Sequence, residues 1–303
     1  MKKIKMSLPV LLATCAVVII SFTASFYYEP SNCFTWKVEI NKSIFYLTGS
    51  VHAANEESFP LPKAYMESYS KADKVILELK DDKNALEQKV MQYAEKDRLK
   101  EDQYLHRHLS AASLQKLSQL FVTDELKLNQ YYQYESWLLN MAIAGTRSRL
   151  TGYNPFFAID MYFNQLAKKD KKEIIGLDDL QTQLLLFEYE VPFEMQVKII
   201  EKAVSEMEGE AKKDSLLFEA YFKNNIVQFE NAFLKTFDFN KPQMKQAYDL
   251  VFTNRNIKWV EQFEKLSIEK PGKYFVMVGA GHYFGPNNIR ELLEHKGYTI
   301  EKI

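Results

Sequence analysis

Two similar blocks near the ends of the chain constrain its fold more than any other feature. Each block has an apolar, β-branched and aromatic run that ends in Gly-x-x-His, at residues 49–52 and again at residues 279–282. Runs of this kind that end at a glycine turn are typical of buried strands. In both blocks a loop, a helical stretch and another strand-like run follow the histidine. We therefore predict two related βαβ halves, with both histidine loops at the same edge of one sheet.

The residues between the two blocks predict a large helical insertion. From 85 to about 266, apolar side chains recur every three or four positions, which is typical of amphipathic helices. The exception is the β-branched run at 173–177, which predicts one more strand of the same sheet. We expect a mixed α/β (α+β) fold in which residues 34–303 form one domain around a central mixed sheet. A chain of 303 residues with 47% apolar content can bury such a core.

The N-terminus has the pattern of an export signal. Lys2, Lys3 and Lys5 precede a stretch without charged residues, from 6 to 28, that is rich in aliphatic residues. Residues 1–28 therefore predict either a cleaved signal peptide or an N-terminal membrane anchor, with a linker over 29–33. The lysines would place the rest of the chain on the periplasmic or extracellular side of the membrane. A weak similarity to a lipobox ahead of Cys15 leaves a lipoprotein as a third possibility.

Composition and missing motifs exclude several classes of function. The net charge of −1 provides no basic face for a nucleic-acid partner. The sequence has no G-x-G-x-x-G or Walker pattern for a nucleotide cofactor, and no G-x-S-x-G for a hydrolase serine. Its two cysteines cannot form a disulfide framework, and we expect Cys33 to lie in the linker as a poor nucleophile.

The two repeated histidines, His52 and His282, need an acidic partner for most chemistry. Glu78 is the best candidate, because it lies at the C-terminal end of the strand-like run at 74–79, among apolar residues. A carboxylate there is costly to bury unless a cation or a hydrogen-bond donor accompanies it. Two neutral imidazoles and one carboxylate are a common ligand set for divalent transition-metal ions. Two simpler interpretations stay open: the histidines are structural hydrogen-bonding residues, and Glu78 reaches solvent at a sheet edge.

Several short motifs, in their order and spacing, give the chain a family resemblance. It resembles the TraB/GumN family, which also contains the Tiki-type metalloproteases, over most of residues 34–303. The segments that carry the resemblance are L-T-G-S-V-H at 47–52, A-D-K-V-I-L-E-L at 72–79, A-I-D-M-Y-F at 158–163, I-G-L-D at 175–178, R-N at 255–256 and V-G-A-G-H-Y-F-G at 278–285.

The resemblance implies a metal site formed by His52, Glu78 and His282, with Mn²⁺, Co²⁺ or Zn²⁺ as the expected ion. It also implies catalytic roles for Glu78 and for residues of the R-N pair. Arg255 would stabilise an oxyanion or orient Glu78, although a structural ion pair is an equal alternative. The residues that we expect in the same pocket or around it are Asn256, Asp160, Asp178 and Tyr283.

Two details of this pocket stay open. Asp178 stands where many relatives have glutamate, so its role is unsettled. Asp160 has the simpler alternative of capping or packing its own helix.

The combined expectation is an exported, membrane-associated, metal-dependent hydrolase. It would be a peptidase that uses a metal-activated water on a peptide or small-molecule substrate. The alternative is a non-catalytic extracytoplasmic protein that sequesters a peptide, haem or a metal complex. A third possibility is a scaffold in which the Gly-x-x-His turns only terminate strands. Some family members are associated with peptide-pheromone shutdown or polysaccharide gene clusters without a proven reaction, so membership alone does not settle catalysis.

Overall fold

The computed structural model describes residues 33–184 and 192–303, and a six-stranded sheet forms their centre. The strand order across the sheet is β4-β3-β5-β2-β1-β6. β1 is antiparallel to both of its neighbours, and the other pairs are parallel. The strands are β1 Thr35–Ile40, β2 Ser43–Ser50, β3 Lys74–Leu77, β4 Glu173–Gly176, β5 Lys273–Gly279 and β6 Ile300–Lys302. The prediction of a mixed α/β fold with a central mixed sheet is confirmed.

The two predicted halves are present, and they meet in the middle of the sheet. The first is β2–α2–β3, with α2 at Lys63–Lys71, and the second is β5–α14–β6, with α14 at Ile289–His295. β2 and β5 are parallel neighbours whose last paired residues are Ser50 and Gly279. Because parallel strands end at the same edge of a sheet, the two histidine loops leave side by side.

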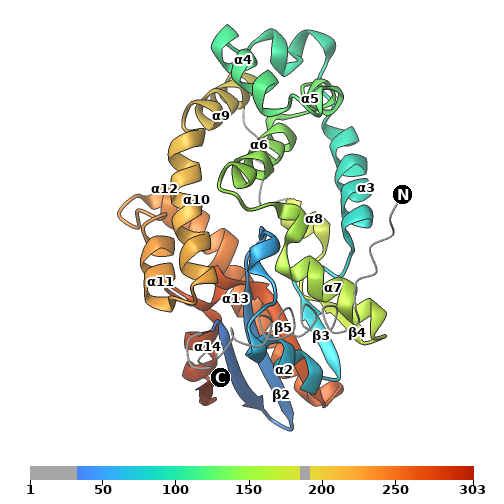
Figure 1. Cartoon of the computed structure of the whole chain (residues 1–303), viewed down its shortest axis with the longest axis vertical. Helices are drawn as coiled ribbons and strands as arrows, with labels where there is room; N and C mark the ends of the chain where they lie inside the picture. The colour runs from blue at the N-terminus through green and yellow to red at the C-terminus, as the bar shows by residue number, and fades with distance from the viewer. Residues whose placement is uncertain (1–32, 185–191) are drawn as a thin grey trace, which may run out of the picture.

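Helices make up most of the chain between the two halves. Figure 1 shows α4, α5, α6 and α9 at the end of the molecule that lies away from the sheet. The predicted strand at 173–177 is β4, and it follows α7 in the chain. The helices of this region are α3 Lys83–Ala94, α4 Ala111–Leu120, α5 Glu125–Tyr131, α6 Ser136–Leu150, α7 Ile159–Lys169, α8 Leu180–Leu184, α9 Phe193–Ser205, α10 Met207–Phe222, α11 Ile226–Leu234, α12 Pro242–Tyr248 and α13 Asn254–Glu269.

Both faces of the sheet are buried under aromatic side chains. On one face, the rings of Phe45 and Tyr274 stack with centroids 4.7 Å apart, and Phe263 of α13 covers Phe45. On the other face, Phe275 packs against Tyr69 of α2 and Phe163 of α7. A sheet covered on both sides offers polar chemistry only at its strand ends, so its carboxyl edge is where a site is expected.

The first described residue lies beside the last one. Cys33 is 1% exposed, and its thiol donates to the carbonyl of Ile303 at 3.3 Å. Of the predicted linker at 29–33, only this buried cysteine lies among the described residues. The predicted signal or anchor at 1–28, with Cys15, lies outside them. Among the described residues, no helix is both long enough and apolar enough to cross a bilayer.

Candidate functional site

Glu78 is the residue on which the contacts at the carboxyl edge of the sheet converge. It directly follows β3, and its side chain is only 13% exposed. One carboxylate oxygen, Oε1, accepts the backbone N–H of Gly279 at 2.7 Å. The other, Oε2, accepts Arg255 Nη2 at 2.5 Å and Gln183 Nε2 at 3.2 Å. The carboxylate that the sequence places at the end of an apolar strand is therefore paired with a cation, as its burial requires.

The second histidine, His282, is buried in the short helical turn Ala280–Tyr283 that follows β5. Its Nδ1 lies 2.6 Å from Oδ1 of Asn256, and the amide of Asn256 is oriented by donation from Nδ2 to the carbonyl of Asn287. This network assigns the proton of His282 to Nδ1. The lone pair is then on Nε2, which lies 3.9 Å from Glu78 Oε1.

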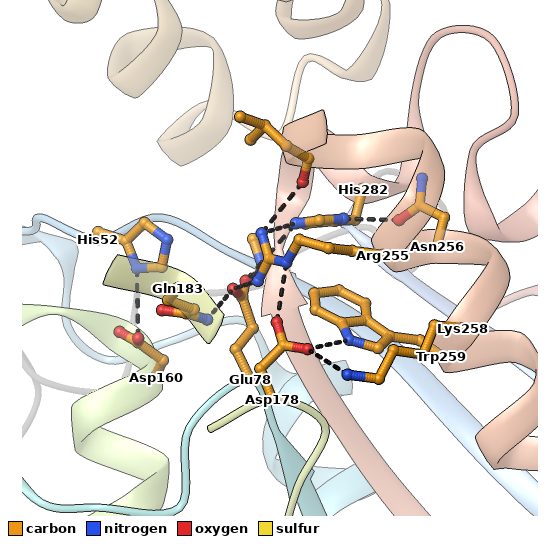
Figure 2. Close-up of polar contacts among 12 residues, drawn as sticks. His52, Glu78, Asp160, Asp178, Gln183, Arg255, Asn256, Lys258, Trp259 and His282 are labelled. Carbon is orange, nitrogen blue, oxygen red and sulfur yellow. Dashed lines mark hydrogen bonds and ion pairs between the residues drawn. The ribbon is translucent and has the colours of Figure 1, made fainter. Parts of the chain in front are cut away.

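The first histidine has a similar arrangement with a carboxylate in place of the amide. His52 Nδ1 lies 3.2 Å from Oδ2 of Asp160, the second residue of α7, and the imidazole is 66% exposed. Figure 2 shows His52 and Asp160 beside the group formed by Glu78, Arg255 and His282. Both histidines are thus held at Nδ1 by an oxygen acceptor, which is how proteins orient metal-binding or acid–base imidazoles.

Gly279 lies where the three predicted ligands approach one another. A Cβ atom built on it would be 3.3 Å from Glu78 Oε1, 3.6 Å from His52 Nε2 and 3.7 Å from His282 Cδ2. Any side chain at this position would fill the space between the imidazoles and the carboxylate. This is a local reason for glycine at the end of β5.

Arg255 links the two acidic residues of the site. From the first turn of α13, it donates through Nε to Asp178 Oδ2 at 2.9 Å and through Nη2 to Glu78. Its Nη1 lies 3.2 Å from the carbonyl of Val251 and 3.3 Å from His282 Nε2. Trp259 supports the pair, because its indole donates to Asp178 Oδ1 at 3.1 Å and its ring lies 4.5 Å from the guanidinium.

The turn before Arg255 is π-helical, at Asp249–Thr253. π-Helical turns inside helices are frequent at functional sites, where they redirect side chains. Here the π-helical turn contains the Val251 carbonyl that accepts from Arg255.

The charges of the site follow from these contacts. Burial lowers the pKa of His282 to about 3, so this imidazole is neutral at neutral pH. Burial opposes ionisation of Glu78, but the positive charges of Arg255 and His52 and the N–H of Gly279 lower its pKa to about 2. Desolvation opposes a charge on His52 too, but the carboxylates of Asp160 and Glu78 outweigh it and raise the pKa of His52 to about 9.

The other glycines of the second block are explained by aromatic packing. A Cβ on Gly281 would lie 2.8 Å from Phe233 and 2.9 Å from Phe252, so any larger residue would displace the turn that carries His282. Gly285 has φ +78°, a conformation that favours glycine, and the hydroxyl of Tyr248 would be 2.6 Å from its Cβ.

Most of the predicted site residues come together at this edge. Asp160 contacts His52, Asn256 contacts His282, and Asp178 contacts Arg255. Tyr283 differs from them, because its ring lies in the core 5.1 Å from Trp36 and its buried hydroxyl has no hydrogen-bond partner among the described residues.

Sequence reasoning missed two contributors, Gln183 and Trp259, as direct partners of the acidic residues. Gln183 lies on the short helix α8, five positions after Asp178, in a stretch with no motif. Trp259 lies four positions after Arg255, so helical spacing alone could have placed both on one face of α13.

The donor set of two imidazoles and one carboxylate fits a divalent metal in the kind of ligand atoms that it offers. His52 Nε2 and Glu78 Oε1 lie beside the Cβ position of Gly279, His282 Nε2 lies 3.9 Å from Glu78 Oε1, and each imidazole has a hydrogen-bonded Nδ1. Within residues 33–184 and 192–303, however, no three His, Cys, Asp or Glu side chains are close enough together to hold an ion as they lie. Binding would therefore require the exposed imidazole of His52 to move towards the other two.

Comparisons with known proteins match nearly the whole described chain. The uncharacterized protein YbaP of Escherichia coli K12 is 22% identical over 253 residues, which cover 82% of this chain and 87% of that protein. YbaP of Shigella flexneri is 22% identical over 252 residues with the same coverage. No solved structure matches the chain significantly. The model of the TraB/PrgY/gumN family matches residues 34–302, and the chain therefore belongs to that family.

Proposed function

We propose that this protein is a metal-dependent hydrolase that cleaves peptides. The observation that carries the proposal is the paired orientation of the imidazoles. Asp160 and Asn256 each hold one histidine at Nδ1, so that Nε2 is the ring nitrogen that each histidine turns towards the site. His52 Nε2 lies 3.6 Å from the Cβ position of Gly279, and His282 Nε2 lies 3.9 Å from Glu78 Oε1 and 3.3 Å from Arg255 Nη1. A histidine with no role at the site would not require a hydrogen-bond partner that fixes the orientation of its ring. Imidazoles oriented in this way beside a carboxylate are typical of metal centres.

In this proposal His52, His282 and Glu78 would hold the ion. A bound divalent ion would supply a water of lowered pKa as the nucleophile for hydrolysis. Asp160 and Asn256 accept from Nδ1 of the two histidines, so that Nε2 would be the ligating atom of each once His52 has released its second proton. Arg255 and the N–H of Gly279 keep Glu78 ionised, and the positive charge of Arg255 would stabilise the carbonyl oxygen of a substrate as it gains negative charge.

The location of this activity is part of the same proposal. The lysines and the uncharged stretch of residues 1–28 support export, with the domain on the periplasmic or extracellular side of a membrane. Export would bring the site into contact with extracytoplasmic peptides.

The test is the metal content of the purified chain. We expect wild type to retain about one equivalent of Mn²⁺, Co²⁺ or Zn²⁺ after loading and desalting, measured by inductively coupled plasma mass spectrometry. His52→Ala and His282→Ala should each lose most of it, since removing one of three ligands costs more than the 10–100-fold typical of outer-shell partners. His295→Ala removes an exposed histidine at the end of α14 and serves as the control. Equal occupancy in all four proteins would contradict the proposal.

The separation of His52 from the other two groups favours one second candidate, a binding protein without turnover. The same side chains would then retain a peptide, haem or a metal complex. A peptide library incubated with each of the three ions distinguishes the two functions: tight retention without cleavage under every condition supports the binding protein.

A further inference from the structure

We propose that Arg255 is a positioning residue that sets the affinity of the site for a divalent ion by competing with the ion for Glu78 and His282. This inference rests on the proposed function, because it concerns the ion that the function requires. It assigns to Arg255 a role in addition to stabilising a substrate oxyanion.

The competition follows first from the lone pair of His282. In the tautomer that Asn256 fixes, Nε2 has one lone pair, and Arg255 Nη1 lies 3.3 Å from it. A metal ion ligated by Nε2 needs that same lone pair. The contact between Arg255 and His282 and the bond to an ion are therefore mutually exclusive.

The contact with Glu78 adds to this competition. Arg255 Nη2 lies 2.5 Å from Oε2, the closest contact that this carboxylate makes. The side chains of Arg255 and Glu78 are only 10% and 13% exposed, so water screens this pair poorly. A guanidinium is always charged, and a divalent ion placed beside it meets direct repulsion.

Asp178 gives Arg255 a contact that it can keep while it releases the site. Its fully buried carboxylate accepts from Nε, whereas the contacts with Glu78 and His282 use only the two terminal nitrogens. Release of Glu78 and His282 therefore does not require loss of the Asp178 contact. The stacked ring of Trp259 supports the same end of the side chain.

A competing role and a purely supporting role of Arg255 predict opposite changes in ion affinity when this residue is replaced. If Arg255 only orients Glu78 for the ion, its removal weakens ion binding. If Arg255 competes with the ion, its replacement by a shorter, neutral side chain strengthens ion binding.

The test measures ion affinity, independently of any activity, in the full-length chain. Zn²⁺, Mn²⁺ and Co²⁺ are titrated in competition with a chromophoric chelator into wild type, Arg255→Gln and Arg147→Gln. The last variant is a matched control, because Arg147 also donates through Nε to a partly buried aspartate, Asp214 at 2.7 Å, in a different part of the fold. We expect Arg255→Gln to bind roughly tenfold tighter than wild type, since a nearby positive charge is removed, and Arg147→Gln to match wild type.

The outcomes separate this inference from the proposed function. If wild type binds the ion and Arg255→Gln binds it equally or more weakly, the competition is overturned while the metal-dependent function stands. If neither protein binds any of the three ions, both proposals fail.

A second measurement keeps the test decisive should Arg255→Gln not fold. In wild type, saturation with the diamagnetic ion Zn²⁺ should shift the guanidinium N–H resonances of Arg255 and accelerate their exchange with water. Unchanged Arg255 resonances in the Zn²⁺-bound protein would overturn the proposal without any substitution.

Discussion

His52 and His282 have opposite electrostatic environments although they approach the same glycine. Asp160 adds a full negative charge beside His52, whereas Asn256 offers His282 only a neutral oxygen. His52 is consequently protonated at neutral pH, with a pKa of about 9, and buried His282 is neutral. Ion binding at the proposed site would therefore displace one proton, from His52.

The first prediction at this scale concerns the pKa of His52. In Asp160→Asn, treated with a chelator, we expect the pKa of His52 to fall from about 9 towards the usual 6.5, because the larger of the two negative charges that raise it is gone and only Glu78 remains. Proton NMR titration of the imidazole C–H measures this directly. A variant that still titrates near pH 9 would contradict the assignment of Asp160 as the partner.

The same shift fixes the direction of a pH effect on stability. Since the folded-state pKa is raised, protonated His52 stabilises the fold fully below pH 6.5, and the contribution disappears as pH rises through about 9. The unfolding midpoint of wild type relative to Asp160→Asn should therefore decline over that interval.

A second prediction concerns the space at Gly279. Its φ of −50° and ψ of 133° are accessible to alanine, so Gly279→Ala should fold. The new methyl would enter between Glu78 Oε1 and His52 Nε2, and we expect roughly a tenfold or greater loss of ion affinity with little change in melting temperature. Gly209→Ala, whose Cβ would meet nothing within 4 Å, is the matched control. Unchanged affinity in Gly279→Ala would mean that this space is not the ion site.

At the scale of elements, local patterns predicted the strands and helices closely. The helical stretch expected after the first histidine loop is α2 at Lys63–Lys71, and the β-branched run at 173–177 forms β4. The predicted end of the strand at 74–79 was less exact, because β3 ends at Leu77 and Glu78 is the first residue beyond it. Periodicity detects which face of an element is buried, and it is least sensitive to where the element stops.

The partners within the site were harder to predict than the elements. His282 and Asn256 are 26 positions apart on different elements, and Glu78 and Arg255 are 177 positions apart. Only the packing of α13 against the sheet brings the members of each pair together, and no local sequence pattern predicts how α13 packs. The family resemblance named these residues, but the pairing of each with its neighbour required the structure. Gln183 had neither a motif nor a periodic signal.

The turn between β5 and α14 supports a prediction on stability. Gly281→Ala places a methyl within 3 Å of Phe233 and Phe252, and overpacking of this kind typically costs about 1–3 kcal/mol. Urea unfolding should show a lower midpoint with an unchanged slope. Gly145→Ala, inside α6 with nothing within 4 Å, should leave stability equal or raise it by about 0.5–1 kcal/mol. Equal stability of Gly281→Ala and wild type would contradict the tight packing of this turn.

At the scale of the whole molecule, the two ends of the described chain close one side of the sheet. β1 lies between β2 and β6, so the last strand pairs with the first, from Trp36–Lys302 to Val38–Ile300. The thiol of Cys33 donates to Ile303, and the ammonium of Lys302 contacts the carbonyl of Cys33. Because β1 is antiparallel to β2, its first residue, Thr35, pairs with Thr48 near the end of β2, and the last described residue lies at this same edge of the sheet.

Because Cys33 is buried beside β6, the reactivity of its thiol reports whether β6 is paired with β1. Burial raises the pKa of its thiol, and a buried, protonated thiol reacts slowly with disulfide reagents. In a Cys15→Ser background, where Cys33 is the remaining cysteine, we expect deletion of residues 300–303 to accelerate the reaction with a chromogenic disulfide at least tenfold, because the covering strand and the Ile303 acceptor are both lost. Far-UV circular dichroism would verify that the shortened chain keeps its helices. Equal rates in the two proteins would mean that β6 does not protect this edge, and the N-terminal segment would then be joined to the domain without support from its C-terminus.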